Sequence, residues 1–259
     1  MTTAILQARM GSQRLPGKVL RKIIGKPMLE LQLERIRQAS SITKIVVATS
    51  VHAVDNPVAE ICSELEVECF RGSLEDVLDR YYKAALAFEA NQIVRLTGDC
   101  PLCDPDVIDR VVQFHLDGDY DYTSNVIKLT YPDGLDVEVF SRSALETAWC
   151  KAELPSHREH VTFYFLKNPD QFKLGSVENA KDLSSLRWTV DYEEDFMLAT
   201  EIFERLYKTK SCFRMDDIVE LINSDQGLAM LNAKHNYGEG WITSFEKDKK
   251  WCKGEGKTR

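Results

Sequence analysis

Short apolar runs alternate with amphipathic stretches through the first hundred residues of the chain. The runs have the length of buried strands, and the stretches between them repeat apolar positions with the period of an α-helix. Strands are expected at residues 3–6, 45–48, 67–70 and 93–96, with helices at 27–39, 56–65 and 74–90. Strands that are apolar on both faces and separated by helices indicate an α/β fold with a mostly parallel sheet covered on each side. Ligands of such sheets bind beyond the carboxyl ends of the strands.

The alternation becomes irregular after about residue 120. Further strands are expected at 120–124, 135–140, 172–177 and 188–191, and further helices at 143–152, 156–167, 196–207 and 215–223. No Ser- or Gly-rich linker separates this half of the sequence from the first, so we predict one domain over residues 1–245. Within it, residues 120–185 are predicted to form an inserted lid, acceptor-binding or dimerisation subdomain. The segment 246–259 is predicted to be a flexible tail.

Composition narrows the possible partners. The 259 residues carry a formal net charge of -8, and an acidic surface repels nucleic acid and anionic lipid. No run approaches the roughly 20 apolar residues of a membrane span, and the N-terminus lacks the pattern of a signal peptide. The seven cysteines are scattered and odd in number, which favours reduced thiols over a disulfide framework. We therefore expect a cytoplasmic protein.

A turn-rich loop, ARMGSQRLPGK at residues 8–18, directly follows the first strand. The first acidic residue of the chain is Glu30, and it is preceded by six cations: Arg9, Arg14, Lys18, Arg21, Lys22 and Lys26. Glycines let backbone N–H groups approach phosphate oxygens, while Arg and Lys supply positive charge. This positive segment in an acidic chain predicts a site for a small polyanion.

Two carboxylates, Asp99 in LTGDCPL and Asp191 in LRWTVDY, each follow an apolar strand. Mg²⁺ (or Mn²⁺) prefers such oxygen ligands, takes one or two protein carboxylates and completes its shell with water and substrate phosphates. The pair therefore predicts a metal site opposite the cationic loop. Alternatively, Asp99 shapes a turn, and the acidic residues 193–195 after Asp191 meet a helix N-terminus without any metal. Asp104 is expected to cap the next helix.

The residues expected at an acceptor site lie further along the chain. Asp136 and Glu138 alternate with apolar residues in PDGLDVEV, so their side chains would share one strand face, either lining a cleft or solvated. Arg158 and His160 in SHREH can recognise a carboxylate or phosphate. His157 and His160 also have the spacing of helical zinc ligands, although no third ligand is evident.

Cys100 and Cys103 form a CxxC pair. The spacing suits thiol redox chemistry, but the pair adjoins Asp99 rather than a thioredoxin-like unit. We expect two small buried side chains under the turn.

Several segments together resemble a known family: ARMGSQRLPGKVL, LTGDCPL, YPDGLDVEVFSRSALETAW, SHREHVTFYFLKNPDQF and DLSSLRWTVDYEEDF. In this order, over roughly residues 2–223, they are similar to SpsF-type cytidylyltransferases of spore-coat polysaccharide biosynthesis. They are more distantly similar to CMP-Kdo and CMP-sialate synthetases. The resemblance implies a Rossmann-like, GT-A-like nucleotidyltransferase fold, Mg²⁺ or Mn²⁺, and a homodimer. It also implies transfer of CMP from CTP to a sugar acid or phosphorylated acceptor, with release of pyrophosphate, for surface polysaccharide or glycoconjugate biosynthesis.

The resemblance assigns roles to individual residues. Arg14, Lys18 and Asp99 would be catalytic, and Asp99 and Asp191 would bind the metal. The acceptor would contact Asp136, Glu138, Arg158 and His160. The residues expected to bind the nucleotide are Ala8, Arg9, Met10, Gly11, Ser12, Arg14, Lys18, Arg71, Ser73, Thr97 and Gly98.

Two departures leave the acceptor open. CMP-Kdo synthetases usually have Gln where this chain has Thr97, and SpsF-type chains typically have Pro where it has Phe163. The alternatives are a nucleotidyltransferase that uses another nucleotide, a metal-dependent glycosyltransferase of similar fold, or a non-catalytic nucleotide-binding module. The cations of LPGK argue against the glycosyltransferase, because they suit a free triphosphate.

Overall fold

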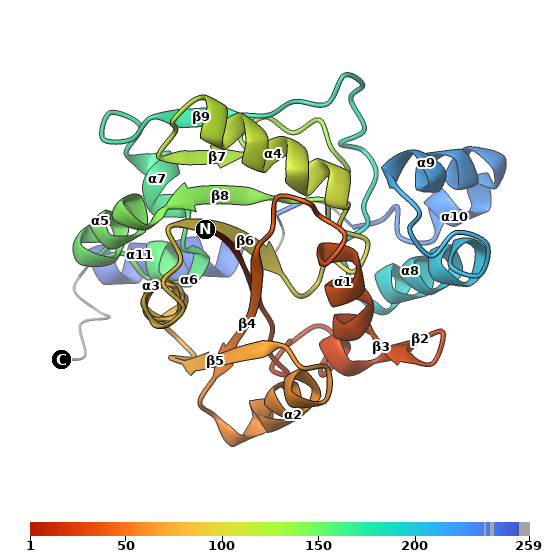
Figure 1. Cartoon of the computed structure of the whole chain (residues 1–259), viewed down its shortest axis with the longest axis horizontal. Helices are drawn as coiled ribbons and strands as arrows, with labels where there is room; N and C mark the ends of the chain where they lie inside the picture. Colours follow the sequence, from red (N-terminus) through yellow and green to blue (C-terminus); the bar gives the residue numbers. More distant parts are fainter. Residues whose placement is uncertain (236, 239–240, 254–259) are drawn as a thin grey trace.

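A seven-stranded sheet forms the centre of the molecule (Figure 1). The computed structural model describes residues 1–235, 237–238 and 241–253. From one edge the strands are β5 (Glu68–Gly72), β4 (Lys44–Ser50), β1 (Thr2–Gln7), β6 (Gln92–Thr97), β8 (Glu138–Ser141), β7 (Tyr122–Ser124) and β9 (Leu174–Ser176). The first four are parallel, β8 is antiparallel to both its neighbours, and β9 is parallel to β7. The mostly parallel α/β fold is therefore confirmed.

Helices cover both faces of the sheet because successive strand residues point to opposite sides. On one face, Ala4 and Leu6 of β1 join the apolar core with α1 (Met28–Ile36), α2 (Asn56–Glu64), α4 (Pro105–Asp117), α8 (Glu193–Leu206) and α9 (Met215–Ser224). On the other, Ile5 packs with α3 (Val77–Ala87), α5 (Arg142–Lys151) and α7 (Phe163–Lys167). Asp104 caps α4, as expected, by accepting from the amides of Asp106 at 2.8 Å and Val107 at 3.3 Å.

The ends of the central strands are level. Gln7 at the end of β1 pairs in register with Ala48 of β4 and with Thr97 of β6. The loops that follow these strands therefore begin at the same edge of the sheet, where the sequence places the candidate site.

Residues 120–185 extend the same sheet through β7, β8 and β9 and add α5, α6 (Pro155–His160) and α7. The single helix expected over 156–167 is wrong, since Val161 has a φ of 58° between α6 and α7. A β-branched residue rarely adopts this left-handed backbone, and local sequence does not announce it.

The strand expected over 188–191 is also absent from the described residues, apart from an isolated bridge between Asp133 and Arg187. The amides of Trp188 and Thr189 donate to the Asp133 carbonyl, and that of Val190 donates to the Asp99 carbonyl at 2.7 Å. The segment is therefore bonded to the loops that contain Asp133 and Asp99, and it does not pair with a neighbouring strand. The sequence also gave no sign of the hairpin β2 (Lys22–Ile23) and β3 (Lys26–Pro27).

The C-terminal part adds α10 (Gln226–Met230) and α11 (Trp241–Cys252). The flexible tail expected over 246–259 is wrong for residues 246–252, which belong to α11; residues 254–259 lie outside the described part. Asp248 of α11 accepts a bond from the Ser156 amide of α6 at 2.9 Å, so α11 is fastened to α6. None of the helices in the described residues is long and apolar enough to cross a membrane.

Candidate active site

The cationic loop after β1 is fixed at its base by a buried acid. The Met10 amide donates to Asp55 Oδ1 at 2.7 Å, and the Met10 carbonyl accepts from the amides of Ser12 and Gly17, both at 3.0 Å. Gly17 has a φ of 70°, a left-handed conformation that glycine adopts without strain, and it leads into the short helix Lys18–Leu20. The turn directs Lys18 back under the loop.

Lys18 joins the two predicted metal-binding acids. Its Nζ lies 2.8 Å from Asp191 Oδ1, 3.5 Å from Asp99 Oδ2 and 2.7 Å from the Val190 carbonyl oxygen. Only 7% of the residue is exposed. The structure therefore brings the opening loop, Asp99 after β6 and Asp191 before α8 to one place, as the sequence predicted.

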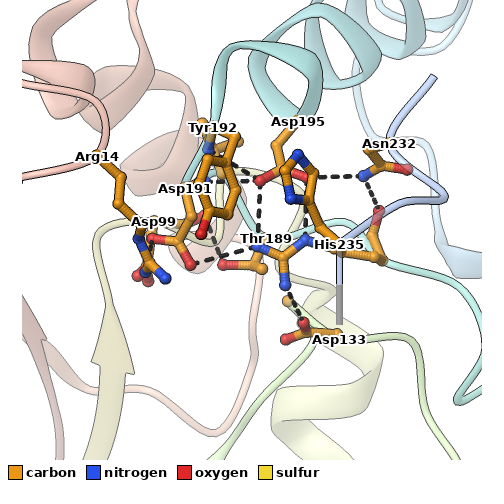
Figure 2. Close-up of polar contacts among 12 residues, drawn as sticks. Arg14, Asp99, Asp133, Thr189, Asp191, Tyr192, Asp195, Asn232 and His235 are labelled. Atoms are coloured by element: carbon orange, nitrogen blue, oxygen red, sulfur yellow. Dashed lines mark hydrogen bonds and ion pairs between the residues drawn. The ribbon is translucent and has the colours of Figure 1, made fainter. Parts of the chain in front are cut away.

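Two arginines contact the Asp191 carboxylate, and Figure 2 shows one of them, Arg14, beside Asp191. Arg14 Nη2 lies 2.7 Å from Asp191 Oδ1, and Arg187 Nη2 lies 3.3 Å from Asp191 Oδ2. Arg187 also contacts Asp133 at 2.8 Å and Asp195 at 3.0 Å. Asp195 in turn accepts from the amides of Asp191 and Tyr192 at 2.9 and 3.0 Å. This network fixes the position of Asp191.

The charges stabilise one another in their ionised forms. Burial by itself would raise the pKa of Asp99, but the Lys18 ammonium together with hydrogen bonds from Thr97, Cys100 and the backbone outweighs it, and the pKa falls to about 2. Burial opposes the charge on Lys18 as well, and Asp99 and Asp191 nevertheless raise its pKa. Both partners therefore remain charged across the physiological range.

Close backbone approach at the site depends on two glycines. A Cβ on Gly98 would lie 3.0 Å from the Gln7 carbonyl oxygen, so glycine allows β6 to end against β1. A Cβ on Gly134, whose φ is 105°, would lie 2.4 Å from the Thr189 nitrogen. Gly134 thus lets the loop before β8 support the segment that carries Asp191.

The other residues expected to bind nucleotide lie at the same sheet edge. Arg71 donates to the carbonyl oxygens of Ser50 and His52, both at 2.9 Å, and Ser73 Oγ accepts from the Asp76 amide at 3.0 Å. Thr97 ends β6 and its carbonyl accepts from Gln32. Their roles toward a nucleotide stay predictions.

The four residues expected to contact the acceptor differ in their surroundings. Glu138 pairs with Arg95 and accepts from Tyr122 Oη at 2.7 Å, while Arg158 pairs with Asp76 and donates to the Trp149 carbonyl oxygen at 2.7 Å. Of the four, His160 lines a small cavity beside the loop. Asp136 is half-buried, and its desolvation together with the neighbouring carboxylates of Asp133 and Glu138 raises its pKa well above the usual range.

The CxxC thiols are buried beneath the site, as expected. Burial raises the pKa of Cys103 to about 12 and that of Cys100 well above the usual thiol range. High pKa values leave both as unreactive thiols at neutral pH. His157 and His160 do not form a metal site, since the described residues contain no group of three potential His, Cys, Asp or Glu ligands.

Sequence reasoning missed two buried arginines, Arg187 and Arg80. Arg187 is separated by 54 residues from Asp133, so no local pattern connects them. Arg80 did leave a signal, because it falls on the apolar face of α3 between Val77 and Tyr81. A cation on a buried helix face needs an anion or a ligand.

The two carboxylates beside Lys18 fit a hard divalent cation. Asp99 and Asp191 offer carboxylate oxygens that already meet on one ammonium group, and Mg²⁺ requires no more than two protein carboxylates. Side chains of 30% and 14% exposure leave Asp99 and Asp191 accessible to water and a phosphate.

A cationic glycine loop facing two acids at the carboxyl edge of a parallel sheet is the arrangement of a nucleotidyltransferase, in which positioned charges assist phosphoryl-type transfer. The family model described as "Cytidylyltransferase" matches residues 3–236, and the chain belongs to this family. The expected SpsF-type resemblance is confirmed too. The chain is 35% identical over 208 residues to the spore coat polysaccharide biosynthesis protein SpsF of Bacillus subtilis, covering 78% of this chain and 85% of that protein.

Solved structures agree on the fold. A cytidylyltransferase from Leptospira borgpetersenii superposes with a TM-score of 0.84 at 33% identity, covering 88% of this chain and 96% of that one. A CMP-Kdo synthetase complexed with CTP superposes with a TM-score of 0.62 at 20% identity, covering 79% of this chain and 98% of that one. The second likeness establishes the shared nucleotidyltransferase fold.

Proposed function

We propose that this cytidylyltransferase transfers CMP from CTP to a sugar acid or phosphorylated acceptor, with Mg²⁺ bound by Asp99 and Asp191. The meeting of both carboxylates on Lys18, beside Arg14, carries the proposal. The CTP in the CMP-Kdo synthetase structure supports the donor, and the name of the Bacillus relative supports a role in surface polysaccharide synthesis.

In the proposed step, an acceptor hydroxyl oxygen bonds to the α-phosphorus of CTP. The bond from that phosphorus to the bridging oxygen breaks, pyrophosphate leaves with its electron pair, and the hydroxyl proton passes to water. Arg14 and Lys18 offset the charge that accumulates on the leaving group. A divalent cation held by Asp99 and Asp191 would supply further positive charge to neutralise the phosphates.

Arg187 and Asp195 would act on this step indirectly. By fixing Asp191, they keep its oxygen at the metal position before substrate arrives, so no reorganisation is needed during the reaction. They are positioning residues.

Pyrophosphate release tests the function. The purified protein is given CTP, ATP, GTP or UTP in turn, each with a panel of sugar acids and phosphorylated sugars. We expect release with CTP and one acceptor class, lost when EDTA removes the metal. Equal release with all four nucleotides would reject the CTP preference. Metal-dependent binding without turnover on any acceptor would indicate a non-catalytic module.

We further propose a cytoplasmic homodimer formed partly through residues 120–185. All seven cysteines are unpaired, which supports a reducing compartment. Ile127 and Leu129, between β7 and β8, expose 38% and 39% of their surface, and such neighbouring apolar side chains suit an interface. Light scattering should give twice the chain mass, and the double variant Ile127→Lys/Leu129→Lys should give a monomer. A monomeric wild type would reject the dimer.

A further inference from the structure

A small cavity beside the opening loop is lined by an arginine, Arg80, two of whose guanidinium nitrogens lack a hydrogen-bond partner among the described residues. The cavity has a volume of about 120 Å³ and is lined by Ala8 and Arg9 at the loop, Arg80 of α3, Arg95 of β6, and Glu159 and His160 of α6. Pockets that hold drug-sized ligands are about 300–1,000 Å³. This cavity therefore suits one anionic group rather than a nucleoside.

Arg80 is the unusual member of the lining. It is 1% exposed, and its Nε and Nη1 atoms have no hydrogen-bond partner among the described residues. A buried, unsatisfied guanidinium costs several kcal/mol, so such a group is retained for a reason other than stability. Gly72 leaves room for it, since a Cβ there would lie 3.0 Å from Arg80 Cγ.

The nearest acids do not neutralise Arg80. Asp55 and Asp76 raise the pKa of Arg80, yet burial, the largest effect, lowers it overall, with Arg9 adding to the decrease. Asp55 is engaged by the Met10 amide and Ser50, and Asp76 by Arg158.

The remaining charges of the cavity are largely paired within the protein. Arg95 faces Glu138, although its Nε also lacks a partner among the described residues. Glu159 is bound by Lys247 of α11 at 3.0 Å. Arg80 and the exposed Arg9 therefore leave the cavity with a positive charge that an incoming anion would neutralise.

We propose that this cavity binds the anionic group of the acceptor, a carboxylate or a phosphate, through Arg80 with Arg9. The proposal rests on the proposed cytidylyl transfer, because the cavity adjoins Ala8 and Arg9, where the expected nucleotide loop begins. When the acceptor is bound in this cavity, its carboxylate or phosphate lies on the face of the sheet that α3 covers. The Lys18–Asp191 pair stays available for the triphosphate.

Inorganic phosphate and acetate serve as probes of the two possible groups. Thermal unfolding is followed with saturating CTP and Mg²⁺, which occupy the triphosphate site, while either anion is titrated. We expect the wild-type Tm to rise with phosphate if the acceptor is phosphorylated, and with acetate if it is a sugar acid. No rise with either anion would overturn the proposal.

The substitution Arg80→Met removes the positive charge and keeps a long, unbranched side chain. The anion affinity should fall about tenfold to a hundredfold, while the affinity for CTP stays unchanged. The Tm without anion should be equal or higher, because an unsatisfied buried charge is lost. If Arg80→Met has a lower Tm but still binds the anion, Arg80 has a structural role. If Arg80→Met no longer binds CTP, the cavity belongs to the nucleotide site. Either result would overturn the proposal.

Two further variants complete the test. Arg80→Lys keeps the charge without the planar fork and should weaken anion binding less than Arg80→Met; if neither variant folds, Arg80 is structural and the proposal fails. Lys83→Met changes an exposed cation on the same helix and should alter nothing. If wild type binds anion through Arg80 but never releases pyrophosphate, the anion site stands and cytidylyl transfer is rejected.

Discussion

The buried ammonium of Lys18 donates a hydrogen bond to the Asp191 carboxylate at 2.8 Å, across 173 residues of sequence. The same nitrogen lies 3.5 Å from Asp99. One lysine therefore connects the first loop of the chain with both carboxylates proposed to bind the metal.

Lys18→Met should reduce the rate of pyrophosphate release about 100- to 1000-fold, because one charge facing the leaving group is lost. Its Tm should fall as well, since the ammonium between Asp99 and Asp191 would be lost and Asp191 would be left with its two arginines, and Mg²⁺ should restore part of the loss. Steady-state kinetics and thermal unfolding measure both. Lys22→Met, an exposed neighbour, is the control. An unchanged rate would remove Lys18 from the active site.

Asp99→Asn and Asp191→Asn should each abolish most metal-dependent pyrophosphate release. Asp191→Asn should also lower the Tm more than Asp99→Asn, because Asp191 pairs with Arg14, Lys18 and Arg187. Asp216→Asn, on the exposed side of α9, should behave as wild type. A near-normal rate of pyrophosphate release in either Asp99→Asn or Asp191→Asn would reject that residue as a metal ligand.

Gly134→Ala should destabilise the protein by about 3 kcal/mol or more, since the new Cβ would meet the backbone of Thr189 at a φ of 105°. Activity should fall with it, because the displaced segment carries Asp191. Urea unfolding measures the change. Gly11→Ala, which meets nothing within 4 Å, should keep wild-type stability. Equal urea midpoints for Gly134→Ala and Gly11→Ala would contradict the close approach of Gly134 to the Thr189 backbone.

Stability should decrease in mild acid through His115. The ring is buried between Thr123 and Gln92, and burial lowers its pKa from 6.5 to about 4. The unfolded chain thus binds the proton first, so this contribution is complete above pH 6.5 and is lost as the pH falls toward 4, by up to about 3 kcal/mol.

Urea unfolding from pH 7 to 4 measures this effect of His115. His115→Asn should reduce the slope of unfolding free energy against pH and leave the part contributed by His160, whose pKa is also lowered to about 4 mainly by burial, whereas His52→Asn, at an exposed histidine, should not change the slope. The same slope in wild type and His115→Asn would exclude His115 as its source.

Much of the first half of the chain was predictable. Its strands are apolar on both faces, and Pro27 and Asp104 mark helix starts, so local patterns suffice. The predicted meeting of the opening loop with Asp99 followed from the rule that parallel strands share a carboxyl edge.

Other features depend on contacts that no local pattern contains. Residues 188–191 have a strand-like composition, but their amides bond to the Asp99 and Asp133 carbonyls. The roles of Arg187 and Arg80 depend on side chains that are distant in sequence, so neighbouring residues do not reveal them. The helix breaks at Val161, a fully buried β-branched residue whose own backbone preference disfavours the φ of 58° that it adopts.

Helix α11 fastens one wall of the proposed acceptor cavity. Its Ser244 contacts His160 at 2.8 Å, and its Lys247 contacts Glu159 at 3.0 Å. Yet the family match ends at residue 236, before α11 begins. The lining residues Glu159 and His160 lie within the matched residues, whereas the helix that holds them in place lies beyond the match. A change confined to α11 should therefore alter the shape of this cavity while leaving Lys18, Asp99 and Asp191 in place.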